Sequence, residues 1–63
     1  MKRAHKEKIE TLCGDLDDLA NVLTEITDDY DGDLDEDEET ELETLSEVHD
    51  SIRAAIGQLE DLL

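Results

Sequence analysis

Apolar residues recur along two stretches of the chain at alternating spacings of three and four. The first stretch places in this pattern Ile9, Leu12, Leu16, Leu19, Leu23, Ile26 and Tyr30. The second places Leu42, Leu45, His49, Ile52, Ile56, Leu59 and Leu63. This spacing brings every member of a set to one side of a helix, as in the seam of a coiled coil. The sequence therefore predicts two helices, each with one apolar seam.

The segment between the two seams carries residues that end one helix and begin another. Gly32 suits the left-handed C′ position after the first helix. Asp35 or Asp37 can cap the second helix, and Asp35 with Glu38 has the spacing of a capping box. The expected elements are a helix over about 4–30, an acidic turn over about 31–36 and a helix over about 36–63.

Two long helices joined by so short a turn favour antiparallel neighbours. We therefore expect residues 1–63 to form one all-α domain, an antiparallel, coiled-coil-like two-helix hairpin. A single continuous helix is the competing structure, and Gly32 and the dense like charges of residues 28–39 count against it. A lone hairpin leaves one side of each seam wet. Pairing two hairpins about a two-fold axis, as a homodimeric four-helix bundle, would bury both sides.

Length and composition also favour self-association. A chain of 63 residues buries little surface and usually needs additional stabilisation from a disulfide, a metal or an oligomer. Cys13 is the only cysteine, so no disulfide can form within the chain, and no Cys/His set has zinc spacing. Self-association is the remaining route to a sufficient core. The core expected from the seams, in the dimer, consists of Ile9, Leu12, Leu16, Leu19, Leu23, Ile26, Leu42, Leu45, His49, Ile52, Ile56 and Leu59.

The net charge of −16 argues against direct binding to nucleic acid or to anionic membranes. Four of the five cations lie within residues 1–8, where they can complement the C-terminal end of the second helix. No segment has the roughly 20 apolar residues that cross a bilayer, and no apolar stretch follows the basic start as in a secretory signal. A lone thiol without an export signal fits a reducing cytoplasm.

Eleven of the sixteen residues in the segment 28–43 are acidic, and we call this segment the acidic tip. The eleven are Asp28, Asp29, Asp31, Asp33, Asp35, Glu36, Asp37, Glu38, Glu39, Glu41 and Glu43. Carboxylates spaced along a rigid scaffold can imitate a phosphate backbone. We therefore expect an inhibitor or regulator, a nucleic-acid mimic whose tip docks on the basic, nucleic-acid-binding surface of a partner protein. Solubility and adaptation to high salt are alternative reasons for the same charge.

In a second class of function, the protein binds its partner through the apolar seams and not through the acidic tip. In a structural or assembly module, the apolar and small residues hold a partner helix, and the acids keep the chain soluble. Replacing Leu19 or Ile52 by a charged residue would then abolish function, whereas substitutions in the tip would do little.

Asp29, Asp31, Asp35 and Glu38 fall at ligand positions of a partial calcium-loop pattern. The first position of that pattern requires aspartate, and here it is Thr27. Because a partial match is easily met among so many acids, we expect diffuse cation binding and no defined metal site. No cofactor is implied.

No constellation of catalytic residues is visible, and we expect no enzymatic activity. Cys13 lacks a base and an orienting group, and two thin helices rarely form the apolar pocket that raises the pKa of a carboxyl group. His49, at a seam position, is expected to be a partly buried, hydrogen-bonded residue that can set register. As a proton switch it would instead loosen the bundle near pH 6.

The hairpin plan, with seven seam positions in each helix, resembles that of the small homodimeric four-helix-bundle RNA-binding regulators of plasmid copy number. The resemblance covers length and periodicity. The basic helix face that such regulators need is here mostly acidic or small, so their activity is not carried over. In composition the chain is also similar to small acidic inhibitors of host nucleic-acid enzymes encoded by phages.

Overall fold

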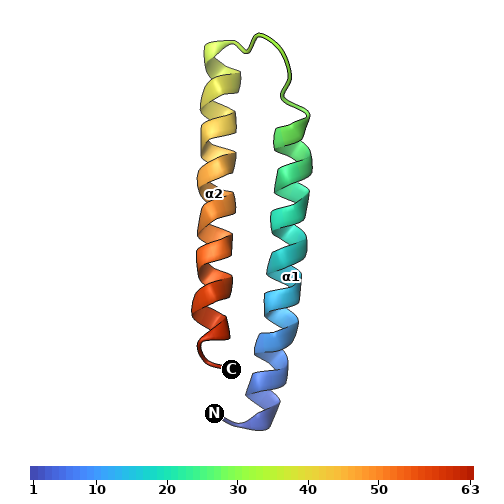
Figure 1. The fold of residues 1–63 in the computed structure, drawn as a ribbon, viewed down its shortest axis with the longest axis vertical. Helices are drawn as coiled ribbons and strands as arrows, with labels where there is room; N and C mark the ends of the chain where they lie inside the picture. Colours follow the sequence, from blue (N-terminus) through green and yellow to red (C-terminus); the bar gives the residue numbers. More distant parts are fainter.

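The chain forms two antiparallel helices joined by one loop (Figure 1). A computed structural model describes all 63 residues, with α1 at Arg3–Asp28 and α2 at Glu36–Glu60. The two helices pack against each other along their length, and both chain termini lie at the end opposite the loop. This confirms the all-α hairpin. Neither helix is long and apolar enough to span a bilayer.

The end of α1 differs from the sequence prediction, which placed it at about residue 30 with Gly32 as the C′ residue. α1 stops at Asp28, where the amide of Asp29 bonds to the carbonyl of Ile26 in a tightened last turn. Gly32 has the expected positive φ, +75°, but it lies within the loop and is not the C′ residue of α1. The helix ends without a left-handed residue because this tightened turn closes it first.

The start of α2 follows the predicted cap. Asp35 is the N-cap residue, and its carboxylate accepts a hydrogen bond from the amide of Glu38 at 2.8 Å. Four acidic residues occupy the first turn, where the helix dipole favours negative charge. α2 ends at Glu60, earlier than expected, and residues 61 and 62 continue as a turn and not as helix.

The interface between the helices is thin. Only Ala20 and Ile56 are buried, at 0% and 9% exposure. Around them lies a line of half-buried residues, contributed by α1 through Ile9, Cys13, Leu16, Leu23 and Thr27 and by α2 through Leu42, Leu45, His49, Ile52, Ala55 and Leu59. The hairpin measures 50 × 15 × 12 Å, so it is a rod in which almost every side chain meets solvent.

The line of α1 residues that packs against α2 lies to one side of the predicted seam. Leu12, Leu19 and Ile26, which were expected in the core of the dimer, are 45%, 54% and 40% exposed within the hairpin. The positions directly after them hold Cys13, Ala20 and Thr27, and these smaller side chains face α2 instead. Spacings of 4 and 3 place these residues on one side of a helix as well as spacings of 3 and 4 do. Small side chains let the two backbones approach more closely, which explains why these residues face α2 and the larger residues before them do not.

Candidate interaction surfaces

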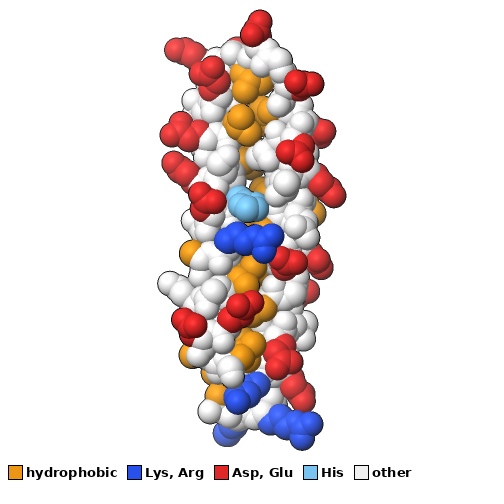
Figure 2. Space-filling model, viewed as in Figure 1, with side chains coloured by type: hydrophobic (Ala, Val, Ile, Leu, Met, Phe, Trp, Pro, Cys, Tyr) orange, Lys and Arg blue, Asp and Glu red, His pale blue; other side chains and the backbone are white.

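The eleven carboxylates of the acidic tip gather at the loop end of the rod. Figure 2 shows red acidic side chains over that end and along both flanks, with blue lysine and arginine side chains at the opposite end and near the middle of the rod. Ten of the eleven residues are exposed, and Glu38 is half-buried. None of them forms an ion pair with a cation, because the salt bridges of the hairpin all lie elsewhere. The tip is therefore a region of uncompensated negative charge.

Two carboxyl groups of the tip interact at the start of α2. The negative charge of Asp35 raises the pKa of Glu38, and a side-chain hydrogen bond with Asp35 and partial desolvation act in the same direction. The amide of Glu38 meanwhile donates to the Asp35 carboxylate. The same cap that starts the helix thus holds two acids side by side.

Tyr30 closes the loop against α2. Its hydroxyl donates a hydrogen bond to Oε2 of Glu41 at 2.9 Å. This bond raises the pKa of Tyr30, and desolvation and the charges of Glu41 and Glu38 add to the effect. The apolar pattern placed Tyr30 in the seam, and its half-buried ring agrees with that. Nothing in the spacing of the two residues pointed to the bond with Glu41.

The four residues of the partial calcium pattern are divided by the local fold. Asp29 and Asp31 lie in the loop beyond α1, whereas Asp35 caps α2 and Glu38 lies in its first turn. No three histidine, cysteine or acidic side chains of the hairpin form a group that could hold a metal ion.

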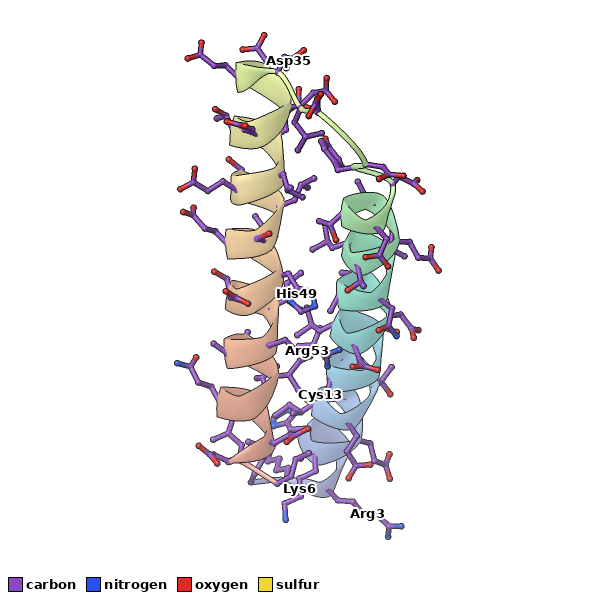
Figure 3. The ribbon with its side chains drawn as sticks, turned by 45° about the horizontal axis from the view of Figure 1, so that its top comes forward. Arg3, Lys6, Cys13, Asp35, His49 and Arg53 are labelled. Carbon is purple, nitrogen blue, oxygen red and sulfur yellow. The ribbon has the colours of Figure 1, made fainter.

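One side of the rod carries a polar bridge between the helices, and we call it the Arg53 face. Arg53 of α2 donates a hydrogen bond to Asp17 of α1 and forms an ion pair with it. His49 lies one turn closer to the loop, in a shallow groove that Thr24 and Ser46 also line. Figure 3 shows His49 and Arg53 between the two helices.

His49 and Cys13 both lie at the interface between the helices. His49 is half-buried, as predicted, but its side chain forms no hydrogen bond; its Nδ1 atom lies 3.7 Å from a carboxylate oxygen of Asp50. Cys13 is a half-buried free thiol.

The opposite side of the rod, which we call the aliphatic face, carries aliphatic side chains that lie beside the packed line of each helix. It consists of Leu12, Leu19 and Ile26 on α1, Val48 and Ala55 on α2, and Leu62 just after α2. Each set repeats every seven residues, so its members line up along one side of a helix. Apart from Ala55, which is half-buried, these residues are between 40% and 54% exposed.

Two contacts establish that both sets share one side. Asp17 comes directly after a residue of α1 that packs against α2, and Arg53 comes directly after a residue of α2 that packs against α1. Their ion pair shows that such positions lie on the Arg53 face. Leu12, Leu19 and Val48 come directly before the packing residues, so they lie on the other side of the rod. There Ile26 borders the same hollow as Glu41, which shares the seven-residue repeat of Val48.

Comparison with models of known protein families, with curated proteins and with solved structures found no match. Two surfaces of the hairpin are therefore the candidates for its function, the acidic tip and the aliphatic face.

Proposed function

We propose that this protein is a small, non-enzymatic protein-binding module that self-associates as a dimeric four-helix bundle. In this proposal it acts as an inhibitor or regulator in the cytoplasm, and its acidic tip docks on the basic, nucleic-acid-binding surface of a partner protein. The observation that carries the proposal is the collection of eleven carboxylates at one end of a rod without cations to pair them. Helix capping uses only Asp35 of the eleven.

The proposal implies an interaction that is driven by charge. A basic surface would gain favourable Coulomb energy at the tip, and added salt would screen it. Duplex DNA and the tip would compete for one surface. The rigid flanking helices support this reading, because carboxylates held on a fixed scaffold pay less ordering entropy on binding than those on a flexible chain.

Capture of partner proteins on the immobilised hairpin, followed by competition with duplex DNA, tests this function. Proteins retained from the native host by the immobilised hairpin are identified by mass, and each is then challenged with duplex DNA. We expect DNA and raised salt to release the partner. Neutralising Glu36, Asp37 and Glu39 as glutamine or asparagine should weaken binding. The matched control neutralises Glu7, Glu10 and Asp18, which are also exposed but lie outside the tip. Retention that is unaffected by neutralising the tip would contradict the electrostatic docking.

A second candidate, an assembly module, is favoured by the aliphatic face. Such a module would bind a partner through Leu19 and its neighbours and would tolerate the tip substitutions described above. Neutralising the tip separates the two functions: it should weaken binding of the tip to a basic surface and spare an assembly role.

A further inference from the structure

The aliphatic face carries few charges on a molecule whose net charge is −16, although the repeat of Val48 continues toward the loop through Glu41. The residues one step farther round each helix border it, and they are Lys8, Asp15, Val22, Asp37, Thr44, Ser51 and Gln58. Three of these seven are charged. The Arg53 face by contrast includes Asp17 and Arg53 themselves, with Asp50 bordering its groove. Carboxylates are therefore scarcer on the aliphatic side than on the Arg53 side, which is not expected of a solvated surface on so acidic a chain.

The amount of exposed surface indicates how large the missing contact is. A compact monomer of 7.1 kDa is expected to expose about 4,100 Å². The hairpin exposes 4866 Å². The excess of about 800 Å² equals what one partner buries in a protein–protein interface of standard size. One further layer of two helices on the aliphatic face would cover this much.

We propose that a second copy of the chain covers the aliphatic face, and that the two copies run in opposite directions, with their acidic tips at opposite ends of the dimer. The proposal rests on the self-association proposed above and adds which face is buried and in which orientation. The two-fold axis lies in the interface, perpendicular to the helices. α1 then packs antiparallel to α1 of the other copy, with Leu19 near the axis, and both Arg53 faces point outward.

Charge selects this orientation. Face-to-face packing about a two-fold axis allows the tips to lie at the same end or at opposite ends. At the same end, the eleven acids of one tip would meet the eleven of the other within a helix diameter or two. At opposite ends, the 50 Å length of the rod separates them, far beyond the Debye length of about 8 Å at physiological salt. Each tip then lies beside the basic start of the other copy, with Lys2, Arg3, Lys6 and Lys8.

Sedimentation equilibrium of matched variants tests which face is buried. Leu19→Gln places a polar group in the proposed interface, twice in each dimer. Ser46→Gln adds the same amide on the Arg53 face, where Ser46 is also exposed. We expect the unaltered protein to have twice the chain mass and Ser46→Gln to match it. Leu19→Gln should raise the dimer dissociation constant by at least about tenfold. A dimer that Leu19→Gln leaves unchanged would overturn this inference while leaving self-association standing, whereas a monomeric unaltered protein would overturn both.

A distance between the tips tests the orientation and does not depend on the folding of an interface variant. The variant for this measurement combines Cys13→Ser with Asp33→Cys, so that a spin label attached to the single cysteine lies on each loop. Opposite orientation predicts a label separation of about 50 Å, the length of the rod. Tips at the same end would give about 20 Å, two helix diameters, and would overturn the proposed arrangement.

Discussion

At the scale of single residues, the hairpin is held by few specific contacts. Its side-chain hydrogen bonds between residues far apart in sequence are those of Tyr30 with Glu41, at one end, and of Arg53 with Asp17, near the middle. Both bonds are exposed, and exposed ion pairs contribute little to stability. Each such contact therefore sets the register of the two helices more than it stabilises them.

Tyr30 offers a direct test of the register at the loop end, because it is the only aromatic residue of the chain. Its hydrogen bond to Glu41 raises the pKa of the phenol above the ordinary value of 10.0. We expect ultraviolet absorbance to show phenolate forming at higher pH in the folded protein than in urea. Glu41→Gln should move the transition back toward the ordinary value. Glu43→Gln, a neighbouring exposed acid without this bond, is the control, and an equal effect of both substitutions would refute the contact.

The N-cap of α2 gives a second prediction at this scale. Asp35→Ala removes the acceptor for the Glu38 amide and should lower the free energy of unfolding by about 1 kcal/mol. Asp35→Asn keeps an acceptor oxygen and should cost less. Urea unfolding followed by circular dichroism measures both, with Asp33→Ala in the exposed loop as the control. If Asp35→Ala and Asp33→Ala prove equally mild, the cap does not contribute to stability.

At the scale of elements, the sequence predicted the two helices and their packing as a hairpin, but it did not determine which side of α1 faces α2. The cap at Asp35 specified the start of α2 because one side chain and one amide determine it locally. The packing side of α1 depended on a choice between Leu12 and Cys13, and again between Leu19 and Ala20. Hydrophobic spacing cannot make this choice, because both sets satisfy a heptad repeat and the decision depends on how closely α2 approaches. The bond between Tyr30 and Glu41 was missed for the same reason, since it exists only once the register is set.

The first turn of α2 should make the protein more stable in mild acid. Because the pKa of Glu38 in the folded state is raised above 4.5, the folded state binds this proton more tightly than the unfolded state. The stability contributed by protonated Glu38 is complete below pH 4.5 and is lost as the pH rises through the folded pKa. Thermal unfolding should therefore occur at higher temperature near pH 4.5 than at pH 7. Glu38→Gln should reduce this gain and Glu47→Gln should not; a midpoint that falls on mild acidification would contradict the prediction.

At the scale of the whole molecule, the hairpin is a rod with a charged tip, one polar face and one aliphatic face. Two buried residues are too small a core to stabilise 63 ordered residues against the conformational entropy of the unfolded chain. Association through the aliphatic face would supply the missing burial. It would also place one acidic tip at each end of the assembly, where its eleven acids outnumber the four cations of the other copy's basic start and can still bind basic partners. The two proposed surfaces are thus compatible in one dimer.

We propose that this hairpin is stable because it associates, and thermal unfolding over a range of protein concentrations distinguishes this from a hairpin that folds alone. For a dimer that unfolds to separate chains, each tenfold increase in concentration adds about 1.4 kcal/mol to the apparent stability and should raise Tm by about 5 °C. We predict this rise for the unaltered protein. A Tm that stays constant over a hundredfold change in concentration would show that the single hairpin folds alone and would contradict the claim.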